Sequence, residues 1–113
     1  MKKSTFLGIL LGSLLSFTAS AGTGTGKITQ VIVHRDDSGH GVVMFRTEGN
    51  SEKAPCSTIT NEWAFSLSNE LGKAMYSLVL AAQAQGKPVT VKGMHQCNDW
   101  SDRESPLYVA VYN

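Results

Sequence analysis

The chain has 113 residues, of which 42% are hydrophobic and 17% are charged, and its formal net charge is +1. This length has room for one domain, and the apolar content excludes a disordered chain. A charge so close to neutrality also excludes a basic surface of the kind that binds nucleic acid, so no nucleic-acid partner is expected.

The first 21 residues have the three parts of a secretory signal peptide. Lys2 and Lys3 precede an apolar stretch over residues 6–17, and the small residues at 19–21 fit a signal peptidase that cuts after Ala21. A retained membrane anchor is disfavoured, because the apolar stretch is shorter than the roughly 20 residues that span a bilayer. We therefore expect an exported protein, periplasmic or secreted, with a formal charge of −1 and no membrane attachment after cleavage.

Cys56 and Cys97 are the two cysteines of the chain. In an oxidising compartment a pair of cysteines in a small domain usually forms a disulfide, and only one intramolecular pairing exists here. A redox pair or a metal site is the alternative, but the chain has no C-x-x-C and no zinc-finger spacing. The sequence thus predicts a structural disulfide, with no metal and no cofactor.

Residues 27–113 are expected to form a single domain behind a flexible Gly/Thr leader at 22–26. Runs of β-branched and alternating apolar residues predict strands at 27–34 and 42–47, joined as a hairpin by the turn sequence at 36–41. In the second strand, Val43 and Phe45 share one face and Val42 and Met44 the other. A polar loop is expected at 48–55, and a third strand at 63–67 in which Trp63 and Phe65 belong to the core.

From Asn69 the apolar residues change to a spacing of three and four, which predicts an amphipathic helix. Ser68 or Asn69 can cap its start, and Gly86 supplies its end. The expected buried face is made of Leu71, Ala74, Met75, Leu78, Val79 and Ala82. Further strands are predicted at 88–94 and 107–112, separated by a polar loop at 98–106.

This element order, β-β-β-α-β-β, predicts a mainly β fold with one helix. Five strands with a helix between the third and fourth is the order of an OB-fold, so an OB-like small barrel is our first interpretation. An open antiparallel α+β sheet with one helix across a face has the same element order and is the alternative.

A spaced pattern of cysteine, aromatic and acidic residues runs through most of the domain. It consists of Cys56, Trp63, Phe65, Gly93, Cys97, Trp100, Asp102 and Glu104. In this pattern the chain resembles a family of small exported, uncharacterised bacterial proteins, and it departs from it at Met94–Gln96, where small residues are usual. More distantly, the layout is similar to the OB-fold B subunits of bacterial toxins, a resemblance that implies a ring of identical subunits and binding of cell-surface glycans.

The loop Asn98–Ser105 is the candidate contact site. Trp100 offers an apolar ring face, and Asn98, Asp102, Arg103 and Glu104 supply hydrogen-bonding groups beside it, a mixture that suits a sugar or a peptide. The structural alternative is that Trp100 covers the disulfide while Asp102 and Glu104 pair with Arg103 in a turn.

No catalytic signature accompanies the three histidines, and His34, His40, Asp36 and Asp37 are explained by a strand end and a turn rather than by a metal site. Tyr108 and Tyr112 form either a cross-strand pair or an exposed platform. The sequence therefore favours an exported, non-catalytic binding module for a glycan or protein ligand. The alternatives are a periplasmic enzyme or enzyme inhibitor acting through Asn98–Ser105, and a toxin-like homo-oligomer.

Overall fold

A computed structural model describes residues 21–59 and 61–112, and the predicted signal peptide lies, apart from Ala21, outside the described residues. Its elements are β1 (Thr23–Arg35), β2 (Gly41–Glu52), β3 (Glu62–Ser66), α1 (Glu70–Gln85), β4 (Val89–Gly93) and β5 (Pro106–Val111). The predicted order of five strands and one helix is confirmed. In the described part of the chain, no helix is long and apolar enough to cross a membrane.

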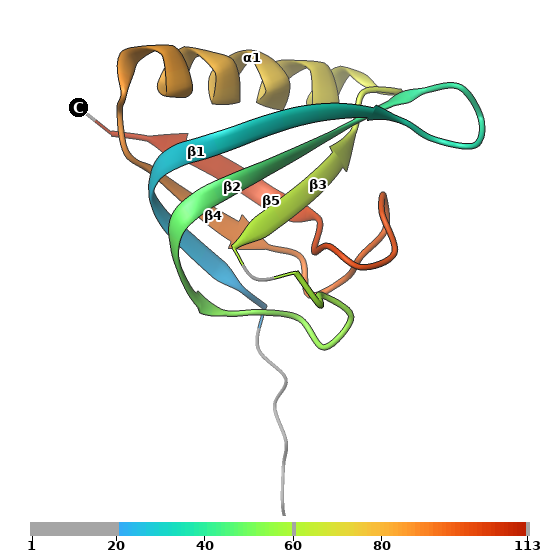
Figure 1. Cartoon of the computed structure of the whole chain (residues 1–113), viewed down its shortest axis with the longest axis horizontal. Coiled ribbons are helices and arrows are strands. Elements are labelled where there is room, and N and C mark those ends of the chain that lie inside the picture. Colours follow the sequence, from blue (N-terminus) through green and yellow to red (C-terminus); the bar gives the residue numbers. More distant parts are fainter. Residues whose placement is uncertain (1–20, 60, 113) are drawn as a thin grey trace, which may run out of the picture.

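The strands form one antiparallel sheet in the order β3-β2-β1-β4-β5. Figure 1 shows the sheet curling beneath α1, which lies across it. The two edge strands come close at a single place, where an isolated parallel bridge joins Trp63 of β3 to Glu104, just before β5. The open antiparallel sheet is therefore the observed architecture.

The first strand begins earlier than expected, so the prediction of a flexible leader at 22–26 is wrong. Residues 23–26 pair with 89–92 of β4, and part of the same stretch also pairs with β2. A Cβ on Gly24 would lie 2.8 Å from Nε1 of Trp63, and Gly26 has a φ of +99° beside a register shift in β1. These glycines allow close packing and a bend in a strand, rather than disorder.

The second strand runs to Glu52, so the polar stretch predicted as a loop at 48–55 is mostly β-strand. Its alternation at 42–45 is as expected, yet all four residues are buried. Val43 and Phe45 join the main core beneath α1, while Val42 and Met44 join Ala64 of β3 in a second cluster on the other face. A layer must therefore cover each face of β2.

The ends of α1 are as predicted, but its buried face is shifted. The Asn69 side chain accepts a hydrogen bond from the Gly72 N–H at 2.8 Å, and Gly86 ends the helix in the left-handed conformation. The buried residues are Gly72, Met75, Val79 and Ala82, whereas Leu71 is 64% exposed and Leu78 is 37% exposed. The helix turns this way because Gly72 packs on β3: a Cβ there would lie 1.8 Å from the Ser66 carbonyl oxygen.

The predicted disulfide is confirmed. Cys56 in the loop after β2 is bonded to Cys97 in the loop after β4, with their Cα atoms 6.1 Å apart and a sequence separation of 41. A cross-link over this separation restricts the unfolded chain, which stabilises the folded state by about 4 kcal/mol in the chain-entropy treatment.

Replacing both cysteines, as Cys56→Ala with Cys97→Ala, should lower the free energy of unfolding by up to about 4 kcal/mol, because the unfolded chain regains its loop entropy. Urea denaturation of the oxidised protein and the double variant measures this loss. Adding a thiol reductant to the unmodified protein is the control and should reproduce most of it. An unchanged unfolding midpoint in both cases would contradict the stabilising role of the disulfide.

Candidate functional site

The loop Asn98–Ser105 lies against the outer face of β2 and β3 and is fastened to the sheet at several points. The Asp99 carboxylate accepts a hydrogen bond from the Ser66 N–H at 3.0 Å, at the end of β3. The Glu104 carbonyl accepts another from the Ala64 N–H at 3.2 Å. The candidate loop is thus a built part of the domain rather than a projecting segment.

Glu104 is the most deeply buried acidic residue of this region, with only 1% of its surface exposed. Its carboxylate accepts hydrogen bonds from the backbone N–H groups of Gly22, Ala54 and His95, at distances of 2.9 to 3.2 Å. A Cβ on Gly93 would lie 1.9 Å from Glu104 Oε2, so glycine is needed there to make room. Glu104 is a structural residue: its oxygens are already used inside the protein, which argues against the predicted ligand contact.

Arg103 is also committed to a structural role. Its Nε donates to Oε1 of Glu62 at 2.7 Å and its Nη1 donates to Oδ1 of Asp102 at 2.6 Å, while Arg46 of β2 donates to the other Glu62 oxygen. Glu62 is only 4% exposed, so the guanidinium groups balance a buried charge. The suggested pairing of Arg103 with Asp102 is present, but its pairing with Glu104 is not.

The pKa values of this cluster reflect the ion pairs. Burial alone would raise the pKa of Glu62, but the hydrogen bonds and charges of Arg103 and Arg46 outweigh burial and hold it below its ordinary value. Burial alone would lower the pKa of Arg103, but its bonds and charge interactions with Glu62 and Asp102 raise it. Both groups therefore stay charged at neutral pH and hold the loop to β2 and β3.

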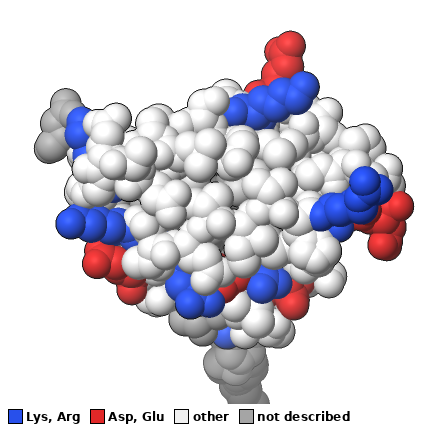
Figure 2. All heavy atoms as spheres, turned by 45° about the horizontal axis from the view of Figure 1, so that its top comes forward, with Lys and Arg blue, Asp and Glu red and all other residues white. Residues whose placement is uncertain are grey.

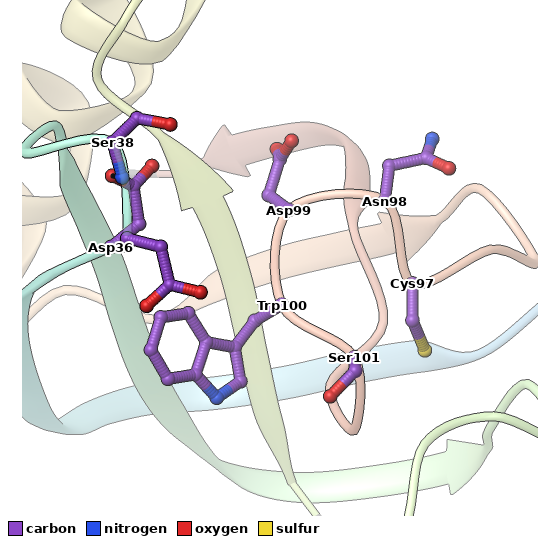
Figure 3. A pocket seen from close by; sticks show the side chains of 8 residues that line it. Asp36, Ser38, Cys97, Asn98, Asp99, Trp100 and Ser101 are labelled. Atoms are coloured by element: carbon purple, nitrogen blue, oxygen red, sulfur yellow. Dashed lines mark hydrogen bonds between the residues drawn. The ribbon is translucent and has the colours of Figure 1, made fainter.

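Trp100 lies on the second apolar cluster rather than on the disulfide. Its side chain packs against Val42, Met44 and Ala64, and its ring meets the His34 ring of β1 with centroids 4.8 Å apart and planes tilted by 59°. In Figure 3 the Cys97 side chain points away from the indole. Trp100 is half-buried, so it covers the outer face of the sheet and still presents part of its ring to solvent.

An open hollow of about 540 Å³ lies beside this ring, between the candidate loop and the turn of the β1–β2 hairpin. Its lining is formed by Asp36, Asp37, Ser38, Cys97, Asn98, Asp99, Trp100 and Ser101. Figure 3 shows Asp36 and Ser38 on the hairpin side and Asn98, Asp99 and Ser101 on the loop side, with Trp100 reaching from the loop toward the hairpin.

The hairpin turn that lines the hollow is held in place by one of its own acidic side chains. Asp36 Oδ1 accepts hydrogen bonds from the N–H groups of Ser38 and His40, at 2.9 and 2.8 Å, which fixes the hairpin turn. Asp37 and Ser101 are exposed, and no hydrogen bond of their side chains is found within the described residues. The hollow thus combines a fixed frame with polar groups that can bond to a ligand.

The structure brings together only part of the predicted site. Asn98 and Trp100 line the hollow, whereas Asp102, Arg103 and Glu104 are outside its lining. Asp36, Asp37 and Ser38 are additions, because the sequence placed them in a turn without showing that the turn folds over the loop. The signal that could have found them is the high density of short polar residues in both segments.

In the described part of the chain, no group of three or more His, Cys, Asp or Glu side chains is arranged to hold a metal ion. Comparisons with protein-family models, with curated proteins and with solved structures give no match for this chain. The interpretation of the hollow therefore depends on its own chemistry.

Lowering the pH should destabilise the protein through Glu62. Because its pKa in the folded state lies below the unfolded value near 4.5, its contribution to stability is complete above that value and is lost as the pH falls through the folded pKa. Urea unfolding between pH 7 and pH 3 should show this loss, and Glu62→Gln should be less stable at pH 7 and less sensitive to acid. The matched control is the exposed Glu52→Gln, which should keep the acid sensitivity of the unmodified protein. Equal acid sensitivity in Glu62→Gln would show that this ion pair does not contribute.

Proposed function

We propose that the protein is an exported, non-catalytic binding module that holds a neutral sugar or an amino sugar in the hollow beside Trp100. The observation that carries this proposal is the half-buried indole next to Asp37, Asn98, Asp99 and Ser101. Sugars present apolar C–H faces as well as hydroxyl groups, so an aromatic ring with polar side chains around it complements both.

The charges around the hollow favour one class of sugar. Asp36, Asp37 and Asp99 line it, and no Lys or Arg is in the lining. Like charges that meet in a site repel each other, so sialic acids and other anionic sugars are disfavoured. Carboxylates accept hydrogen bonds from hydroxyl groups and pair with ammonium groups, which supports neutral hexoses, N-acetylhexosamines and amino sugars as ligands.

The fold also supports this proposal. The strand order and the bridge between Trp63 and Glu104 are compatible with the OB-like interpretation of this open sheet, and in OB-folds the loops between strands surround ligand sites. Export would agree with the disulfide between Cys56 and Cys97. The resemblance to small exported bacterial proteins points to the same compartment, and the similarity in layout to toxin B subunits points to glycans.

An enzyme or enzyme inhibitor acting through Asn98–Ser105 is less well supported. Arg103 and Glu104, the charged groups that such an activity would use, are engaged by Glu62 and by backbone N–H groups. Within the described residues, no hydrogen bond joins Ser101 or Ser105 to a histidine that could activate its hydroxyl as a nucleophile, which suits binding better than catalysis.

A second candidate function is assembly with further copies of the chain. β5 is an edge strand; Leu107 and Tyr108 on it are 54% and 46% exposed, and Tyr112 directly after it is 56% exposed. Figure 2 shows the face that carries α1, where charged side chains lie around the rim and uncharged residues fill the middle. Exposed apolar surface of this kind is found at contacts between proteins. Native mass measurement decides: a ring supports assembly, and a monomer at all concentrations excludes it.

Sugar binding should be visible in the intrinsic fluorescence of the protein. The chain has two tryptophans, and Trp63 is only 1% exposed, so a change in emission on adding a sugar reports on Trp100. Titrating hexoses, N-acetylhexosamines, amino sugars and sialic acid into the oxidised protein should change the emission with one of the first three classes and not with sialic acid. A response to sialic acid alone would contradict the proposed charge preference.

Substitutions around the ring provide a second measurement. Asp37→Asn and Ser101→Ala alter exposed side chains and should leave the thermal midpoint unchanged while weakening sugar capture up to about tenfold, the cost of one hydrogen bond, which is charge-assisted only for Asp37. Trp100→Ala should abolish capture and lower the midpoint by several degrees, because it also uncovers the cluster of Val42, Met44 and Ala64. Tyr112→Ala, an exposed aromatic outside the hollow, is the control. Full capture by the three site variants, Asp37→Asn, Ser101→Ala and Trp100→Ala, would reject the site.

A further inference from the structure

The buried Glu104 carboxylate has hydrogen-bond donors but no cationic side chain beside it. Its three partners are backbone N–H groups, and the ion pairs found within residues 21–59 and 61–112 do not include it. A buried charge is costly unless it is both hydrogen-bonded and paired with an opposite charge. Glu62, the other buried acid, has two arginines. Glu104 therefore lacks the counter-charge that its burial calls for.

Of the partners of Glu104, the backbone nitrogen of Gly22 is the one that can acquire a positive charge. It lies 3.0 Å from Glu104 Oε2 and 3.2 Å from Oε1, so both oxygens face it. Gly22 is itself buried, and a Cβ on it would lie 2.6 Å from Oε1, so only glycine fits against the carboxylate. The Gly22 carbonyl accepts a hydrogen bond from the Gly93 N–H at 2.9 Å, which fixes its position.

The same nitrogen belongs to the bond that the signal-peptide pattern marks for cleavage. The small residues at 19–21 predict hydrolysis between Ala21 and Gly22. Water would add across this amide: the carboxylate leaves on Ala21 with the leader, and the freed amine of Gly22 takes up a proton to become an ammonium. No other change is needed to place a positive charge against Glu104, because the nitrogen already lies between its two oxygens.

We infer that removal of the leader creates the counter-ion of Glu104: the ammonium of Gly22 pairs with this buried carboxylate and locks the processed chain. The inference uses the export expected in the proposed function but is independent of sugar binding. An ammonium in this position replaces a neutral N–H donor by a charged one, and charge-assisted hydrogen bonds are about twice as strong as neutral ones. The mature chain is therefore more stable than any form that carries residues before Gly22.

The position of the pair explains what it would fasten. Thr23, the next residue, is the first of β1 and already pairs with both β2 and β4, so Gly22 lies immediately before the strand. Glu104 holds the backbone at Ala54 and His95, each two residues before a cysteine. Processing would thus reinforce the beginning of the sheet together with the two loops that the disulfide joins.

Four proteins test the pair by thermal denaturation. Two begin at Gly22, released from a fusion by a protease, and two retain Ala21 at the start; each is made with Glu104 and with Glu104→Gln. With Glu104 present, the chain beginning at Gly22 should melt about 5 °C or more above the chain beginning at Ala21. With Glu104→Gln this difference should disappear, whereas it should persist in a further pair of chains that carry the exposed control Glu52→Gln.

Acetylating the Gly22 amine gives a test that needs no substitution, in case Glu104→Gln fails to fold. It removes the charge and should lower the melting temperature by a similar amount. Mass spectrometry of the exported protein should find a chain that begins at Gly22. A different natural start, or equal melting temperatures for free and acetylated Gly22, would overturn the inference. Sugar binding by the acetylated protein is measured separately, so failure here leaves the proposed function standing and the reverse also holds.

Discussion

The Glu104 carboxylate organises the end of the molecule where the long loops meet. Its oxygens accept from the backbone at Gly22, Ala54 and His95, three segments that are far apart in the sequence. Ala54 precedes Cys56 by two residues and His95 precedes Cys97 by two, so the same side chain sets the positions of both cysteine loops. The 6.1 Å separation of the cysteine Cα atoms lies within the range that a disulfide spans, and the Glu104 hydrogen bonds help to hold the two loops at that distance.

Covering both faces of β2 explains why a short domain can bury so much of its sheet. The helix covers Val43 and Phe45 on one side, and the loop that carries Trp100 covers Val42 and Met44 on the other. Without the loop, the second face would expose apolar side chains to water at a cost of roughly 25 cal/mol per Å². The loop is therefore part of the core, and its acidic and basic residues serve first to hold it there.

Local patterns in the sequence are sufficient to predict the strands and the helix, but not the contacts between residues that are distant in sequence. Alternation and spacing placed every strand and the helix, and the caps at Asn69 and Gly86 are present as expected. The structure of the Gly/Thr stretch at 22–26 cannot be predicted from its own residues, because its glycines make room for the side chains of Trp63 and Glu104, which are distant in sequence. The helix face was shifted for the same reason, since Gly72 contacts the backbone of Ser66.

In the candidate site, too, local features can be predicted from the sequence and long-range contacts cannot. Trp100 and Asn98 could be chosen from composition alone, because an aromatic ring among polar residues is a local feature. Arg103 lies in the same polar loop and is an equally good candidate by composition. Its guanidinium, however, forms an ion pair with Glu62, which is 41 residues away in sequence. The hairpin residues Asp36 and Asp37 enter the site only through the folding of β1 over the loop, which brings His34 to Trp100.

If the hollow binds a ligand as proposed, using the same residues for stability and for binding has a physical advantage in so small a domain. Asp99 uses one carboxylate oxygen to hold β3 and Asp36 uses one to hold the hairpin turn, so both walls of the hollow are fixed before any ligand arrives. Trp100 is held on one side by apolar contacts and by His34. Ordering loops and side chains on binding costs free energy, so a hollow whose frame is already rigid loses less of its affinity to that cost. The ion pair of Arg103 with Glu62 and the backbone hydrogen bonds of Glu104 thus hold the loop in place, and the proposed site is left to the other residues of the loop and of the hairpin turn.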